Sequence, residues 1–195
     1  MMLMKTKISD IYSDKKMNSK KPSFLSTTVE HIDITSFDAR PIIDSMGKMS
    51  FTSRETGSAA KIFNEMISDK DCTIFLTLAG STSAGGCMQL YSDLIKYNMV
   101  DAIVATGASI IDMDFFEALG FKHYQGSQFQ DDNVLRENYI DRIYDTYIDE
   151  NELQACDKTI CEIANSLDPK PYTSREFIWE LGKYLKKNSK KKGSL

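Results

Sequence analysis

The stretch TIFLTLAGSTSAGG, residues 73–86, joins a continuous apolar run to a loop rich in glycine and serine. Its apolar part, residues 73–79, is typical of a parallel strand that is buried on both faces. The apolar residues that follow recur at helical spacing: Cys87, Leu90, Tyr91, Leu94, Ile95 and Met99. Residues 100–106, VDAIVAT, then predict a second buried strand. This order predicts a right-handed βαβ unit with both strands in one parallel sheet.

Helices are predicted on either side of this unit. Before it, Asp38 is expected to cap a helix that runs to Met46, and residues 55–67 predict a second helix. After it, DFFEALG, residues 114–120, predicts a short helix that ends at Gly120. The pattern therefore indicates an α/β fold with a parallel sheet flanked by helices.

Further along the chain, apolar residues again recur at helical spacing and predict more helices. NVLRENYIDRIYDTYI, residues 133–148, places four apolar side chains on one helical side: Leu135, Tyr139, Ile143 and Tyr147. Residues 152–167 keep this spacing until two prolines end it. Thr173 and Glu176 then have the spacing of a capping box at the start of a final helix. The tyrosines of residues 139–147 are expected to form core rather than a stacking platform for bases.

Length and composition favour a single globular domain. The chain has 195 residues, of which 42% are hydrophobic and 27% charged. Residues 1–28, rich in Lys, Ser and Met, predict a mobile N-terminal arm, and residues 29–195 the domain. A net charge of −4 gives no basic field to hold nucleic acid or a membrane surface. No stretch has the length of a signal peptide or a membrane span, so a cytoplasmic location is expected.

Cysteine and histidine give no sign of a metal site. The four cysteines show no CxxC spacing and are interpreted as reduced core residues. His31 and His123 lie near neither a cysteine nor each other in the sequence, so no metal ligand is assigned. Each histidine is expected to have a structural role.

The loop GSTSAGG, residues 80–86, is the first candidate binding element. A loop between a buried strand and a helix presents backbone N–H groups at the positive end of the helix dipole, which suits phosphate. The loop matches neither the dinucleotide fingerprint nor the P-loop pattern. Gly80, Gly85 and Gly86 have an alternative role that stays open: they permit a tight turn and close packing of the helix.

A second candidate loop, TGAS (residues 106–109), follows the second strand. Loops at the carboxyl ends of neighbouring parallel strands converge on one crevice. Just beyond it, Asp112 and Asp114 have the chemistry to bind ribose hydroxyls or an ammonium group. Their alternative role is helix capping, and the ligand role is slightly preferred for Asp112.

Several blocks, taken together and in order, resemble one known family. They are FLTLAGSTSAGG, MVDAIVATGASI, FFEALGFKHYQG, DDNVLRENYIDRIYDTYI and SREFIWELGKYL. In this order and spacing they resemble the deoxyhypusine synthase family, especially its bacterial and archaeal branch. The resemblance runs from about His31 to Leu195.

The resemblance implies a Rossmann-like subunit of an NAD-dependent aminobutyl transferase. Such enzymes oxidise spermidine, hold the aminobutyl group on an enzyme lysine as an imine, and deliver it to a lysine of the translation factor 5A precursor. They are homotetramers with active sites at dimer interfaces. By position, the residues that match NAD-contacting segments are Gly80, Ser81, Thr82, Ser83, Ala84, Thr106, Gly107 and Ala108. Asp112 matches an acidic position near NAD and the polyamine, and a one-residue shift leaves Asp114 as the alternative.

The family's second half, with its catalytic lysine, has no counterpart in this sequence. The final KKKGSL does not match that lysine's motif, so no catalytic residue is assigned. The preferred interpretation is the N-terminal portion of a deoxyhypusine synthase-like enzyme, truncated or split, inactive alone and completed by a chain that carries the missing half. The alternatives are a homospermidine synthase-like transferase that uses a free diamine, and an inactive regulatory or cofactor-binding subunit. An incomplete sheet is expected to expose an edge unless a partner covers it.

Overall fold

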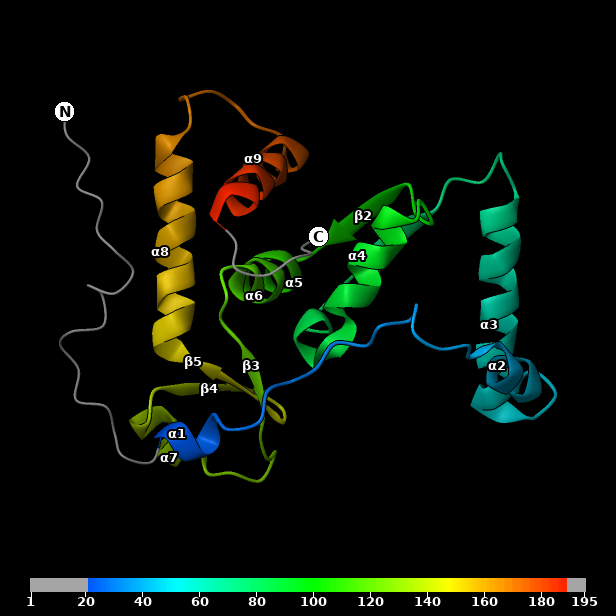
Figure 1. Cartoon of the computed structure of the whole chain (residues 1–195), viewed down its shortest axis with the longest axis horizontal. Coiled ribbons are helices and arrows are strands. Elements are labelled where there is room, and N and C mark those ends of the chain that lie inside the picture. Colours follow the sequence, from blue (N-terminus) through cyan, green and yellow to red (C-terminus); the bar gives the residue numbers. More distant parts are fainter. Residues whose placement is uncertain (1–20, 189–195) are drawn as a thin grey trace.

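The computed structural model describes residues 21–188 and has an α/β fold with two separate sheets (Figure 1). In chain order the elements are α1 (Lys21–Phe24), α2 (Arg40–Met46), α3 (Phe51–Ser68), β1 (Phe75–Leu78), the π-helical turn η2 (Ser83–Cys87), α4 (Met88–Lys96), β2 (Ala102–Ala105), α5 (Gly107–Ser109), the π-helical turn η3 (Ile110–Phe115), α6 (Phe116–Ala118), β3 (His123–Gln125), α7 (Asp132–Glu137), β4 (Ile140–Ile143), β5 (Thr146–Asp149), α8 (Glu150–Ser166) and α9 (Ser174–Asn188).

The predicted βαβ unit is confirmed. Strands β1 and β2 pair in parallel, with Phe75 opposite Ala102 and Leu78 opposite Ala105. Helix α4 connects them and packs Tyr91 and Leu94 against Leu78. The helical spacing of its apolar side chains therefore directs one face of α4 onto the sheet.

The prediction that both strands are buried on both faces is wrong. Phe75 is 63% exposed and Val104 is 58% exposed, whereas Leu78 is 7% exposed. Side chains alternate between the two faces of a strand, and among the described residues the two-stranded sheet is covered mainly on the α4 side. The continuous apolar run therefore predicted the strand correctly. It did not predict that one face of the strand stays exposed.

The prediction of a helix over residues 133–148 is also wrong. Only its start is helical, as α7, and β4 and β5 then form an antiparallel hairpin. The backbone is left-handed at Tyr139 (φ 57°) and at Tyr144 (φ 56°), which ends the helical path at each of these residues. Tyr147 is buried as predicted, but Tyr144 is 64% exposed. β3 joins this hairpin to give the strand order β3–β5–β4.

The larger core lies between the second sheet and the C-terminal helices. Its fully buried members include Phe115, Phe116 and Cys156, with Leu181 of α9 packed against the same cluster. The predicted capping box of α9 is confirmed. The Thr173 N–H donates to Glu176 Oε2 at 2.8 Å, and the Glu176 N–H donates to Thr173 Oγ1 at 3.2 Å.

Helices α2 and α3 form a pair that stands at one end of the molecule in Figure 1. None of their residues is buried. They approach closely at two glycines, since a Cβ on Gly57 would lie 2.5 Å from the Gly47 Cα. Residue Ala39, not Asp38, is the N-cap of α2. The N-cap is thus one residue later than predicted, and the Asp38 carboxylate accepts from the Arg40 N–H at 3.0 Å.

The N-terminal segment is packed from residue 21 onward. Lys21 is buried and its Nζ pairs with Asp149 Oδ1 at 2.6 Å, while Thr28 forms a β-bridge with Tyr124. Residues 21–28, which belong to the predicted mobile arm, therefore contact the second sheet, and residues 1–20 lie outside the described range.

The cysteines differ in their surroundings. All four are free, but only Cys156 is buried, and Cys161 is exposed. Burial, followed by the charges of Asp157 and Asp112, raises the pKa of Cys156 to about 12. Its thiol therefore stays protonated and serves as core, as predicted. The prediction of a core position is wrong for Cys161.

Candidate functional site

The two predicted loops lie together at the carboxyl ends of β1 and β2. Ser109 Oγ donates to the Gly80 carbonyl at 2.6 Å, and Ser83 Oγ donates to the Ser109 carbonyl at 3.1 Å. Both serines are fully buried. These two hydrogen bonds join residues 80–84 to residues 106–109, so the two loops are in direct contact.

The glycines of these loops fall into two groups. A Cβ built on Gly85 or Gly107 meets no heavy atom within 4 Å, and the same holds at Gly80, where φ is +74°. A Cβ on Gly86, where φ is +97°, would lie 2.9 Å from the Glu30 carbonyl oxygen. Gly86 therefore fits the role of close packing. The space at Gly80, Gly85 and Gly107 leaves the backbone open to an approaching group such as a phosphate.

The other residues of the first loop differ in what they can offer a ligand. Thr82 is exposed, and its Oγ1 lies 2.7 Å from the Tyr91 hydroxyl. Ser81 is half-buried, and its carbonyl accepts from the Gly85 N–H at 3.2 Å. Ala84 is 1% exposed and belongs to the larger core. Ser81 and Thr82 thus have accessible side chains, whereas Ala84 anchors the loop.

Of the second loop, Thr106 and Gly107 are exposed and Ala108 is half-buried. The Thr106 carbonyl accepts from the N–H groups of Ser109 and Ile110, at 3.1 and 3.2 Å, which starts the helical turn α5. The buried Ser109 of this loop is the residue that contacts the first loop, while Thr106 and Gly107 stay exposed.

The two aspartates lie inside η3, where neither acts as a helix N-cap. Asp112 is half-buried near Asp157 of α8. Burial, and then the negative charge of Asp157, raises the pKa of Asp112 above its usual value. Asp114 is 2% exposed. The structure thus does not support the capping alternative, and Asp112 is the more accessible of the two carboxyl groups.

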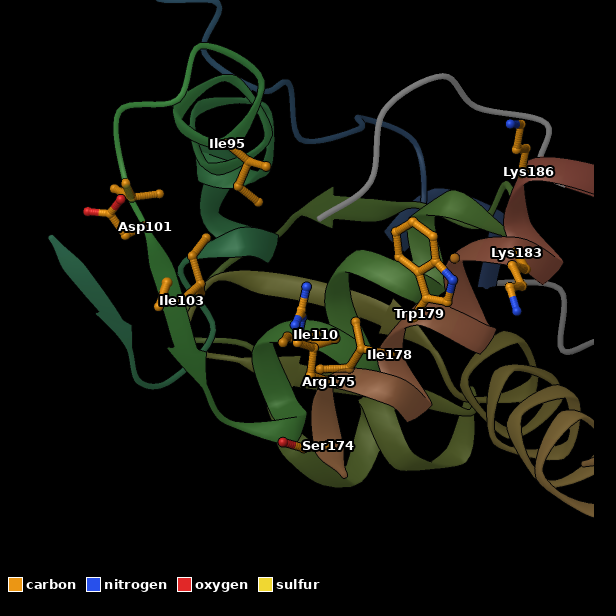
Figure 2. A pocket seen from close by; sticks show the side chains of 13 residues that line it. Ile95, Asp101, Ile103, Ile110, Ser174, Arg175, Ile178, Trp179, Lys183 and Lys186 are labelled. Atoms are coloured by element: carbon orange, nitrogen blue, oxygen red, sulfur yellow. The ribbon is translucent and has the colours of Figure 1, made fainter. Parts of the chain in front are cut away.

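A groove of about 690 Å³ lies between β2 and α9 (Figure 2). Ile95 and Ile103 line one wall, while Ile178 and Trp179 of α9 line the other. Three cations of α9 add a positive rim: Arg175, Lys183 and Lys186. The groove is therefore apolar along both walls and basic along the rim that α9 contributes.

This groove follows an edge of β2 that has no strand partner among the described residues. The Ala102 N–H donates to the Ile74 carbonyl at 3.3 Å, and the Thr106 N–H donates to that of Leu78 at 3.2 Å. Because strand residues alternate in direction, the N–H groups of Ile103 and Ala105 point away from β1. Within residues 21–188, β2 has a strand neighbour on one side only.

Three residues that sequence reasoning did not connect form a buried cluster. Glu117 Oε2 lies 2.7 Å from His31 Nε2, and Glu117 Oε1 lies 2.7 Å from His123 Nδ1. Glu117 is 86 residues from His31 and 6 residues from His123 in the sequence, so no periodic pattern connects the three residues. Among the described residues, no group of three or more acidic, cysteine or histidine side chains is arranged to hold a metal ion.

Residues 21–188 also include no helix that is both long enough and apolar enough to cross a membrane.

A parallel βαβ unit, with loops joined by hydrogen bonds at the carboxyl ends of its strands and a separate antiparallel sheet after it, makes this an α/β protein. The sequence model of the family described as deoxyhypusine synthase matches residues 41–194. The chain belongs to this family, as the sequence resemblance predicted.

Curated relatives agree with this assignment. A deoxyhypusine synthase-like protein of Caulobacter vibrioides is 68% identical over 179 residues, which cover 91% of this chain and 49% of the relative. One from Coxiella burnetii is 69% identical over 176 residues, or 90% of this chain and 50% of the relative. The chain thus spans about half the length of the curated relatives it matches.

A crystal structure assigned to a deoxyhypusine synthase of Entamoeba histolytica has a TM-score of 0.48 at 21% identity, covering 80% of this chain and 55% of that chain. The family assignment rests on the sequence comparisons alone.

Proposed function

We propose that this chain is the NAD-binding part of an aminobutyl transferase of the deoxyhypusine synthase type. The observation that carries the proposal is the pair of hydrogen bonds that joins Gly80, Ser83 and Ser109 across the carboxyl ends of two parallel strands. In α/β sheets this is where nucleotides bind. Family membership supports the same placement.

The space at Gly80, Gly85 and Gly107 is wide enough for a pyrophosphate to approach, because no side chain fills it. NAD would be held there by residues 80–84 and 106–108, and when bound it supplies a hydride acceptor for spermidine. Asp112 is the preferred partner of the ammonium group, with Asp114 as the alternative. The raised pKa of Asp112 is consistent with a carboxyl group that gains from a cationic neighbour.

The acceptor of the aminobutyl group is a lysine of the translation factor 5A precursor or a free diamine. We infer that transfer also needs residues found in the other half of the relatives' length. The unpaired edge of β2 and the groove beside it support a homo-oligomer or a complex with such a chain. The protein is proposed to work in the cytoplasm.

A complementation assay tests this function. The chain is incubated with NAD, labelled spermidine and either the translation factor 5A precursor or a free diamine, alone and with the separately expressed remaining half of the Caulobacter vibrioides relative. Label should reach the translation factor precursor or a diamine only in the mixture. Transfer by the isolated chain would contradict the assignment of chemistry to the other half. A stable complex of both halves without transfer to either acceptor would contradict the proposed activity.

A further inference from the structure

The segment of residues 27–32 runs from the second sheet to the first loop and is called the strap here. At one end the Val29 N–H donates to the His123 carbonyl at 2.9 Å, and the Gln125 N–H donates to the Thr27 carbonyl at 2.7 Å. At the other end the Ile32 N–H donates to the Gly86 carbonyl at 3.0 Å. The strap thus connects β3 directly with the loop that carries Gly80, Gly85 and Gly86.

The strap also fills the space behind Gly86. A Cβ built on Gly86 would lie 2.9 Å from the Glu30 carbonyl oxygen and 3.9 Å from Val29 Cγ1. The left-handed backbone of Gly86 and the path of the strap are therefore matched. A shift of the strap changes the surroundings of Gly86 directly.

One carboxylate fixes the strap at its centre. Glu117 contacts His31 of the strap and His123 of β3, each at 2.7 Å. All three side chains are largely buried: 11% of the His31 side chain is exposed, 6% of the Glu117 side chain and none of the His123 side chain. A contact with a buried carboxylate is strong because the group is costly to leave without its partners.

The cluster leaves two buried nitrogens unsatisfied. Among the described residues, His31 Nδ1 and His123 Nε2 have no hydrogen-bond partner. Replacing either histidine by an apolar residue would remove one of the two contacts through which Glu117 links the strap to β3.

We propose that His31, Glu117 and His123 are positioning residues for the glycine loop, acting through the strap. They lie outside residues 80–84 and 106–108, which are proposed to hold the cofactor. Their contacts hold residues 29–32 against Gly86 and so keep Gly80 and Gly85 in the conformation that leaves their backbone open. This inference rests on the proposed function for its effect on NAD, but the coupling between strap and loop is independent of any ligand.

Amide hydrogen exchange in the full chain tests that coupling without NAD. His31→Ala should raise exchange at residues 85–88 at least tenfold, while exchange in α8 and β5 changes less than threefold. His31→Gln, whose amide can still donate to Glu117, should restore the loop to within about threefold of the unmodified chain. The control is Thr35→Ala, which removes the hydrogen bond from Thr35 Oγ1 to Asp33 Oδ1 just beyond the strap and should leave the loop unchanged.

A second variant covers the case in which His31→Ala does not fold. Ile32→Pro removes the N–H that donates to the Gly86 carbonyl and keeps all three side chains of the cluster in the sequence. It tests the bond between strap and loop, and it should also raise exchange at residues 85–88. Unchanged loop exchange in the folded variants, or a rise spread evenly over the chain, would overturn the proposal.

Calorimetric titration of the same variants separates this inference from the proposed function. NAD affinity should fall about tenfold in His31→Ala and recover in His31→Gln. Absence of NAD binding by the unmodified chain would contradict the proposed function and leave the exchange result to decide the coupling.

Discussion

The parallel pair β1–β2 and the antiparallel sheet β3–β5–β4 differ in how much of each the chain itself covers. The second sheet packs Ile148 into a core with Phe115, Phe116 and Cys156, all at most 2% exposed. The first has a core of three buried residues and exposes Phe75 and Val104. The proposed cofactor loops sit on this less covered sheet.

We infer from this contrast that the two sheets have different roles. The antiparallel sheet with α8 and α9 stabilises the fold, and the parallel sheet carries the site and an edge that a partner can extend. Crossed hydrogen bonds through Ser83 and Ser109, together with the strap, hold the loops where the apolar core is small. Stability and binding should therefore respond to different substitutions.

The largest expected effect is on stability in the antiparallel half. Phe116→Ala removes a fully buried ring from the larger core and should lower the free energy of unfolding by about 3–5 kcal/mol. Val104→Ala, at an exposed position of β2, should change it by less than about 0.5 kcal/mol. Urea denaturation followed by circular dichroism measures both. Equal losses in the two variants would remove the proposed contrast.

The next effect separates two neighbouring glycines. Gly86→Val forces a branched side chain into a left-handed backbone and against the Glu30 carbonyl, and should cost about 2–4 kcal/mol of stability. Gly85→Val, in open space, should cost less than about 1 kcal/mol. The two melting curves, recorded at one protein concentration, compare the variants directly. A Gly85 variant as unstable as the Gly86 variant would contradict the division of the glycines into packing and open positions.

A smaller effect depends on pH. Burial, and then the charge of Asp149, raises the pKa of Glu152 to about 7. Because the folded state holds this proton more tightly, its contribution is fully present below the unfolded pKa of about 4.5 and is lost as the pH rises to about 7. Partial solvent exposure limits the contribution to about 1–2 kcal/mol.

Glu152→Gln should remove this part of the pH dependence, since the amide does not titrate. Urea denaturation at pH 4.5 and pH 7.5 measures the difference for both proteins. The control is Glu162→Gln, an exposed position on the same helix that should retain the slope of the unmodified chain. An identical slope in the Glu152 variant would show that another group is responsible.

Substitution at the exposed face of the parallel sheet β1–β2 is expected to change stability least. It should, however, change self-association clearly. The chain alone should self-associate, and Val104→Lys should lower its average mass in size-exclusion chromatography with light scattering. Ile42→Lys, at a similarly exposed position of α2, serves as the control. A chain that is monomeric at high concentration and indifferent to the other half of a relative would contradict the partner proposal.

Much of the fold follows from local pattern. The βαβ unit, the end of the short helix at Gly120 and the capping box of α9 each rest on residues close in sequence. The helix predicted over residues 133–148 failed because Leu135, Tyr139, Ile143 and Tyr147 fit helical spacing, while the left-handed backbone at Tyr139 and Tyr144 has no comparable signal. The prediction that both faces of the parallel sheet are buried was wrong because burial depends on neighbours that are distant in sequence.

The site was predictable in its loops but not in its supports. Strand ends and glycines identified residues 80–86 and 106–109, which the structure brings together. The bond from Ser109 to Gly80 and the contacts of Glu117 with His31 and His123 join residues up to 86 positions apart, so no periodicity reveals them. The residue roles assigned to NAD and the polyamine stay predictions.

Calorimetric titration of NAD into the chain and into its Gly85→Val variant tests the central claim most directly. Gly85 lies in open space on the proposed phosphate surface, so its substitution blocks the approach of the ligand with little effect on the fold. The unmodified chain should bind NAD weakly, and the variant should show no binding while its melting temperature stays close to that of the unmodified chain. Equal NAD affinity in the two proteins would contradict the assignment of the glycine loop to the cofactor.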